Sequence, residues 1–244
     1  MLEIEGKFNF LGLTFDWPTI ISTTVVVVLT FIIVFIFSRR LTLNPSKRQT
    51  MGEMLVSFTS GLFSDQLEDK NYAKKFGAFG LTLFMFILVS NSIGLVFQIG
   101  SDDITYLKSP TASPVVTMTL ALMSILVAHF SGIFKLGFTG YLKNSYLKPY
   151  AALLPLNIIE KISNFLTLGV RLFANIFSGE LLLMLIANSL ALSNNQFVGF
   201  FRLFAGLPLT VVWQGFSLFI GAIQAYVFVT LTAVYISQMV TKEE

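Results

Sequence analysis

The chain of 244 residues is 55% hydrophobic and only 12% charged, with a mean hydropathy of +0.77, whereas an ordinary soluble domain has about 25% charged residues. Its formal charge of +3 is spread over loops and indicates no nucleic-acid surface. The chain has no cysteine and a single histidine, which argues against a thiolate or histidine metal site, and we expect no cofactor. The composition therefore excludes an independent soluble domain, and it predicts one all-α integral membrane domain, 1–244, because lipid cannot hydrogen-bond exposed backbone groups.

The first predicted span covers residues 19–38, after an outer N-terminal segment, 1–18. That segment lacks the basic start of a secretory signal peptide, so we expect the span to be retained. Basic residues follow the span, and the positive-inside rule places that end in the cytoplasm. They are Arg39, Arg40, Lys47 and Arg48.

Residues 51–67 predict an amphipathic helix that lies along the membrane interface. Apolar side chains recur there at helical spacing, but the segment is too polar to span a bilayer. The apolar positions are Met51, Leu55, Phe58 and Leu62.

The second and third predicted spans cover residues 76–99 and 115–134. Asp102 and Asp103 lie in the loop between them, which we expect to be external, and Lys135 and Lys143 follow the third span on the inside. With two further crossings, the five spans place the N-terminus outside and the C-terminus in the cytoplasm.

The last two hydrophobic runs, 153–192 and 197–240, are unusually long. A helix of about forty residues is about 60 Å long, twice the thickness of the hydrocarbon core. Either each run contains a break, near Gly169 or Pro208, or the two runs form a long, strongly tilted hairpin that a protein partner supports.

Arg171 and Glu180 stand well inside the first long run, where ionisable residues are functional candidates. Arg171 cannot lose its proton, so it requires a carboxylate, water or carbonyl groups around it, unless it extends to the interface. At about 100° per residue, Asn175 and Ser178 share the face of Arg171, whereas Glu180 points to the opposite side.

In the second long run, Thr210, Ser217 and Gln224 recur every seven residues on one face. Such a stripe either joins helices by hydrogen bonds or lines a path for water or ions. His129 in the third span and Asn91 in the second carry the same two interpretations, a proton relay or a buried hydrogen-bonding residue. No phosphate-binding loop or other nucleotide motif is visible, so we expect no direct nucleotide binding.

The segment Thr167–Leu181, TLGVRLFANIFSGEL, resembles subunit a of the bacterial F-type ATP synthase. Three further segments resemble the same family in the same order: Ser109–Pro114, Leu154–Glu160 and Gly221–Ser237. The resemblance implies a non-catalytic, proton-translocating stator subunit of the bacterial cell membrane, with a ring of c subunits and the b subunit of the peripheral stalk as partners.

A self-contained channel or secondary transporter would normally show an internal repeat, and none is evident. A structural membrane scaffold is a third alternative, and it predicts that Arg171 tolerates replacement by an uncharged residue.

The resemblance also implies roles for individual residues. Arg171 would be the essential arginine facing the ring, Gln224 its companion on the last helix, and Glu180 and Asn175 polar positions along the proton path. A nearby arginine lowers the pKa of a carboxyl group by about 1 to 3 units, so each ring carboxylate would release its proton on passing Arg171, and two half-channels would convert proton flow into rotation. Some members of the family carry a histidine where Ser217 stands and an aspartate near Gly94. The sequence is compatible with either H⁺ or Na⁺ as the transported ion.

Overall fold

The apolar runs of the sequence form five helices that are long and apolar enough to cross a membrane, within the residues that the computed structural model describes. Those residues are 7–10, 13–38, 46–96, 99–101, 104–107, 109–147, 153–191 and 196–241. The candidate spans are Trp17–Ser38, Lys70–Gly94, Pro114–Leu136, Leu154–Ile186 and Gly206–Val240. The predicted fold class, a helical membrane protein with five spans, is therefore confirmed.

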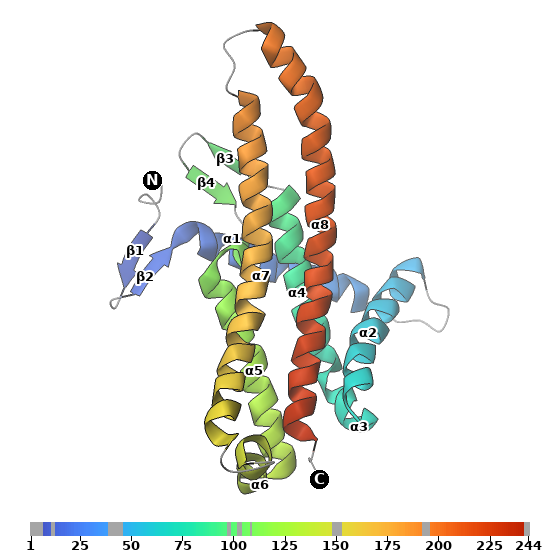
Figure 1. Cartoon of the computed structure of the whole chain (residues 1–244). Coiled ribbons are helices and arrows are strands. Elements are labelled where there is room, and N and C mark those ends of the chain that lie inside the picture. The colour runs from blue at the N-terminus through green and yellow to red at the C-terminus, as the bar shows by residue number, and fades with distance from the viewer. Residues whose placement is uncertain are drawn as a thin grey trace.

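Six long helices and several short ones follow one another along the described part of the chain (Figure 1). The long helices are α1 (Trp17–Ser38), α2 (Lys47–Gln66), α4 (Gly77–Val96), α5 (Pro114–Leu136), α7 (Leu154–Ala191) and α8 (Gln196–Val240). The short ones are α3 (Lys70–Ala73), η1 (Lys74–Phe76), η2 (Pro110–Ala112), α6 (Phe138–Leu142) and η3 (Lys143–Leu147).

Two small β-hairpins lie outside the helices, and the sequence interpretation did not include them. Strand β1 (Lys7–Phe10) pairs antiparallel with β2 (Leu13–Asp16), and β3 (Ile99–Ser101) pairs with β4 (Ile104–Leu107). Their aromatic and β-branched residues favour extended backbone. Helix α4 consequently ends at Val96, before the expected boundary at residue 99.

Helix α2 begins earlier than the interfacial helix expected at 51–67, because the Ser46 side chain caps it by accepting a hydrogen bond from the Gln49 N–H at 3.4 Å. Its apolar residues fall into two groups. Leu62 and Phe63 are buried in the core, whereas Met54 is 72% exposed. An exposed apolar side suits a helix at the membrane interface, which stays a prediction.

Helices α7 and α8 are continuous antiparallel arms of one hairpin, with 38 and 45 residues (Figure 1). The break considered near Gly169 or Pro208 is absent, since both residues lie inside their helices. Gly169 serves close packing, because a Cβ there would lie 2.5 Å from the Met118 sulfur of α5. At about 1.5 Å per residue the arms are about 57 and 68 Å long.

The core forms where α8 packs against α4, α5 and α7. Large apolar side chains such as Phe228 and Ile236 of α8 and Leu172 of α7 are 0% exposed. Small residues face them, including Ala121 and Ala128 of α5, which allows the helix axes to approach closely. This packing fixes the rotation of α7 and α8, and hence the direction of their polar side chains.

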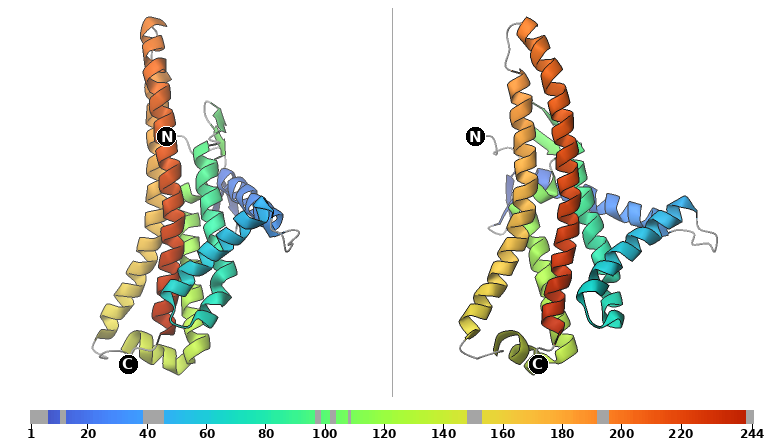
Figure 2. Two further views of the ribbon diagram at one scale, coloured as in Figure 1. Left: turned by 90° about the vertical axis from the view of Figure 1, so that its right-hand side faces the viewer. Right: turned by 45° about the vertical axis from the view of Figure 1, so that its right-hand side comes forward.

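Helix α1 crosses the long hairpin at a steep angle (Figures 1 and 2). It packs against α4 and α2, yet much of its surface is open, with Phe31 68% and Phe35 52% exposed. An apolar surface of this kind requires lipid or another protein chain around it.

Candidate functional site

Polar side chains gather in the interior of the helical bundle, around the middle of α7 and α8. Glu180 is 5% exposed, Gln224 5%, Ser217 8% and Asn91 1%. Buried polar groups require hydrogen-bond partners. The hydrogen bonds in this region form two separate groups, one on each side of α7.

The first group joins Glu180 to the segment that precedes α5. The main-chain N–H of Ser109 donates a hydrogen bond to Oε1 of Glu180 at 3.2 Å. The Ser109 hydroxyl lies 3.0 Å from the Ser90 carbonyl oxygen and 2.7 Å from the Thr111 hydroxyl. The Thr111 hydroxyl donates to Oδ1 of Asn91 at 2.7 Å.

Asn91 extends this group to α8. Its Nδ2 donates to the carbonyl oxygen of Gly221 at 3.0 Å. The contact is close because Gly221 has no side chain, and a Cβ there would lie 3.2 Å from the Cβ of Asn91. One continuous set of contacts therefore connects α7, η2, α4 and α8.

The second group joins the two arms of the hairpin. Nδ2 of Asn175 donates to Oε1 of Gln224 at 3.4 Å, and the Ser178 hydroxyl donates to the Asn175 carbonyl oxygen at 3.0 Å. Nε1 of Trp213 donates to the carbonyl oxygen of Gly179 at 3.3 Å.

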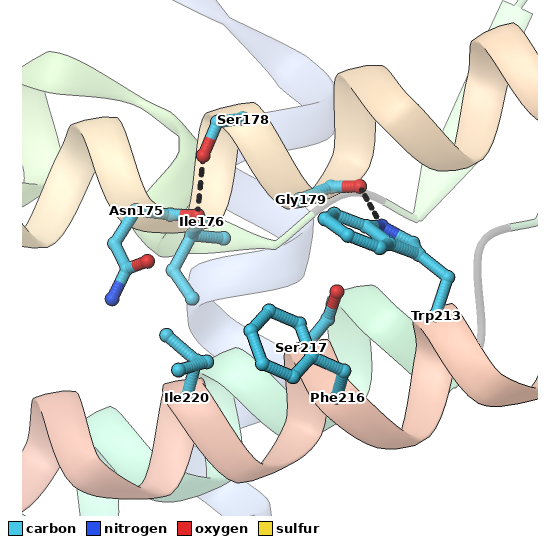
Figure 3. A pocket seen from close by; sticks show the side chains of 8 residues that line it. All are labelled: Asn175, Ile176, Ser178, Gly179, Trp213, Phe216, Ser217 and Ile220. Atoms are coloured by element: carbon cyan, nitrogen blue, oxygen red, sulfur yellow. Dashed lines mark hydrogen bonds between the residues drawn. The ribbon is translucent and has the colours of Figure 1, made fainter.

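A cavity of about 70 Å³ lies beside these contacts, between α7 and α8 (Figure 3). Both arms contribute to its wall, and Ser217 points into it from α8 (Figure 3). The lining residues are Asn175, Ile176, Ser178, Gly179, Trp213, Phe216, Ser217 and Ile220. Because about 10–15 Å³ of such space holds a water molecule, the cavity has room for more than one.

On α8, two buried polar atoms of the predicted stripe have no hydrogen-bond partner among the described residues: the Ser217 hydroxyl and Nε2 of Gln224. Thr210, the first residue of the predicted stripe, instead donates to the Gly206 carbonyl oxygen at 2.9 Å. The stripe therefore faces the other arm of the hairpin, and its buried part offers two free polar groups.

Arg171 lies on the opposite side of α7 from Glu180. Its side chain is exposed, although Leu168 and Leu172 beside it are 0% exposed. No carboxylate in the described part of the chain forms an ion pair with it. Helix α7 thus presents a fixed cation outward and a carboxyl group inward.

His129 lies in different surroundings. Its Nδ1 is 2.8 Å from the Ile125 carbonyl oxygen on its own helix, and its ring centroid is 6.0 Å from that of Tyr141 on α6. These contacts belong to the α5–α6 corner and to neither group around α7.

Three residues of the site were not singled out from the sequence: Ser109, Thr111 and Trp213. Ser109 and Thr111 belong to a segment that carried the family resemblance, but spacing along the chain gave no sign that they contact α4 and α7. In the described part of the chain, no three His, Asp or Glu side chains converge to hold a metal ion.

The fold and these contacts define a polytopic membrane protein whose long helical hairpin carries an outward arginine and an inward glutamate. The sequence model of the family described as ATP synthase A chain matches residues 20–237. The chain therefore belongs to the family of ATP synthase subunit a, the non-catalytic, proton-translocating membrane subunit of the stator.

Three bacterial relatives named ATP synthase subunit a are similar over their whole lengths. The chain is 45% identical to the protein of Pediococcus pentosaceus over 241 residues, which cover 99% of both chains. It is 47% identical to the Limosilactobacillus fermentum protein over 236 residues, 97% of both chains. It is 44% identical to the Enterococcus faecalis protein over 245 residues, 100% of both chains.

Proposed function

We propose that Arg171 faces a ring of ATP synthase c subunits and separates two half-channels through which protons reach and leave that ring. The observation that carries this proposal is the placement of Arg171 and Glu180 on opposite sides of one helix, the first exposed and the second buried.

An exposed arginine within a candidate span needs a partner outside this chain. Arg171 lies inside the span Leu154–Ile186, where a charge facing lipid costs a few kcal/mol or more. Arginine stays protonated at any physiological pH, so only a polar or anionic partner removes this penalty. A ring that carries one carboxyl group per subunit supplies such a partner at each rotation step.

The arginine favours the charged form of each ring carboxylate that passes it. The proton leaves there, and the carboxylate regains a proton before it returns to lipid, because an isolated charge in lipid is unfavourable. The fixed positive charge of Arg171 also repels a proton that would move directly between the half-channels. Rotation of the ring is then the remaining route for proton flow.

Glu180, Asn175, Ser178, Ser217 and Gln224 line the proton path on this proposal. Glu180 is a titratable group held in the interior, and the cavity beside Ser217 offers space for water between the hairpin arms. Water in a polar cavity with hydrogen-bonding walls is favourable. Asn91 supports the path by hydrogen bonding, since its amide is not titratable and both of its ends are engaged.

His129 keeps two interpretations. Its contacts with Ile125 and Tyr141 suit a packing role at the α5–α6 corner, and a proton relay stays the alternative.

Lysines that gather at one end of the bundle support an orientation in the membrane. The segments that carry them, α3 with η1, the end of α5 and η3, lie together with the C-terminus (Figure 1). By the positive-inside rule this end is cytoplasmic and the N-terminus is external, in a bacterial plasma membrane. Arg39, Arg40, Asp102 and Asp103, on which the same prediction depends, lie outside the described residues.

The steep crossing of α1 and the hairpin supports a tilted hairpin. The 22 residues of α1 give about 33 Å, enough to cross the hydrocarbon core upright. Helices α7 and α8 then lie strongly tilted, which accommodates their excess length along the ring. The b subunit of the peripheral stalk and lipid cover the exposed apolar surface of α1.

ATP-driven acidification of inverted membrane vesicles that contain the whole complex tests this function. Arg171→Ala is expected to abolish proton pumping while ATP hydrolysis by the detached soluble head persists, and Glu180→Gln is expected to reduce pumping at least ten-fold. Lys161→Ala and Glu160→Gln, on the same helix, are the matched controls and should pump normally. Normal pumping by Arg171→Ala would make Arg171 a packing residue and favour a structural scaffold or a self-contained transporter.

A further inference from the structure

Ser109, the residue that caps η2, donates a hydrogen bond to Glu180 from outside the long hairpin. Ser109, directly before η2, is 1% exposed, and its main-chain N–H donates to Oε1 of Glu180 at 3.2 Å. A main-chain donor is fixed by the backbone and cannot rotate away as a side-chain hydroxyl can. The direction of the Glu180 carboxyl group is therefore tied to the position of η2.

Helix α4 holds η2 in place through buried contacts. The Ser109 hydroxyl contacts the Ser90 carbonyl oxygen at 3.0 Å, and Thr111 donates to Asn91 at 2.7 Å. Each of these four residues is at most 1% exposed. Buried hydrogen bonds of this kind have no water to replace them, so η2 moves only if α4 moves with it.

Gly94 of α4 is what allows η2 to come so close. A Cβ at this position would overlap the Cβ of Ser109 and would lie 2.6 Å from its Cα and 2.7 Å from its main-chain N. The atoms in the way are mostly backbone, so no side-chain rotation relieves the overlap. Gly94 lies inside a helix and its φ is not positive, so the glycine is needed for space and not for backbone conformation.

We propose that Gly94 and Ser109 are positioning residues for Glu180, in that Gly94 admits η2 and the Ser109 N–H then sets the direction of the Glu180 carboxyl group. This inference rests on the proposed role of Glu180 in proton transfer. With η2 in this position, position 94 has no room for any side chain, a carboxyl group included. The group that meets Glu180 here is instead the main-chain N–H of Ser109.

The test compares Ser109→Ala with Ser109→Pro. Both variants lack the hydroxyl, and only proline lacks the N–H; the φ of Ser109, −57°, is one that proline adopts. Pumping per assembled complex is measured in inverted vesicles, with the amount of complex taken from ATP hydrolysis and immunoblots. Ser109→Ala should retain pumping within about three-fold, whereas Ser109→Pro should lower it about ten-fold or more, because the proline ring carbon Cδ takes the place of the N–H and displaces the Glu180 carboxyl group. Equal pumping by the two variants would overturn the inference.

Gly94→Ala with Gly61→Ala as control gives a second, independent test. Both glycines lie in helices, but a Cβ at Gly61 meets nothing within 4 Å. Gly94→Ala should lower pumping per assembled complex about ten-fold, and Gly61→Ala should leave it unchanged. If Ser109→Pro does not assemble, this pair decides. A Gly94→Ala variant that assembles poorly but pumps normally per complex shows packing alone and overturns the inference.

Glu180→Gln separates the two possible failures. If Glu180→Gln pumps normally, the proposed role of Glu180 is wrong, and the positioning role is overturned with it. If Glu180→Gln is inactive while Ser109→Pro pumps as well as Ser109→Ala, only the positioning role is wrong.

Discussion

Asn175 of α7 and Gln224 of α8 join the two arms of the long hairpin by a hydrogen bond of 3.4 Å between Nδ2 and Oε1. Gln224 is 5% exposed, and its Nε2 has no partner among the described residues. A buried donor without a partner is unfavourable, so this amide is available to water or to a group on a neighbouring subunit. The hairpin thus has a polar contact beside the face that carries Arg171.

Gln224→Leu is expected to reduce proton pumping about ten-fold. The change removes the free donor and leaves Nδ2 of Asn175 without its acceptor, a loss of roughly 1–3 kcal/mol. Acidification of inverted vesicles measures the effect, and Gln238→Leu, at an exposed position of the same helix, is the control. Equal pumping by the two variants would show that Gln224 only joins helices.

A cysteine at position 217 is expected to react with a small hydrophilic thiol reagent in the assembled complex. The chain contains no cysteine, so all labelling of this subunit comes from the introduced thiol. Ser217 faces the cavity of about 70 Å³, whereas Thr232 on the same helix is 0% exposed and outside it. A Ser217→Cys protein that labels no faster than Thr232→Cys would mean that the cavity is dry.

Trp213→Ala is expected to speed the labelling of a cysteine at position 217 several-fold. The indole forms part of the cavity wall and joins α8 to the Gly179 carbonyl oxygen at 3.3 Å. Trp213→Phe keeps a ring there but removes the N–H donor, so it should change the labelling rate less. An unchanged rate in Trp213→Ala would show that the indole does not limit access to Ser217.

Thr111→Val is expected to destabilise the protein by about 1–3 kcal/mol, because it leaves the buried Oδ1 of Asn91 without a donor. The measurement is the temperature at which the solubilised complex loses this subunit, with a shift of about 2–4 °C per kcal/mol. Thr119→Val, at an exposed position of α5, should change stability by no more than about 0.5 kcal/mol. Equal shifts for both variants would contradict a structural role for the η2 contacts.

The sequence by itself determined the class of fold and the placement of Arg171 and Glu180 on opposite sides of α7. An apolar run long enough to cross the hydrocarbon core forms a spanning helix whatever packs around it. Helical periodicity alone places Arg171 and Glu180 on opposite sides of one helix. These are properties of a single segment, and they do not depend on what packs against it.

Tertiary structure alone decided which segments meet those residues. The length of the last two runs allowed either a break or a continuous hairpin, and only the structure shows two continuous helices. The two β-hairpins also depend on strand pairing between short segments, which carries little local signal. The contact of Ser109 with Glu180 joins residues 71 positions apart and exists because Gly94 leaves room for it. Such a contact depends on how two backbone segments approach each other in three dimensions, and the spacing of residues along the chain does not predict that approach.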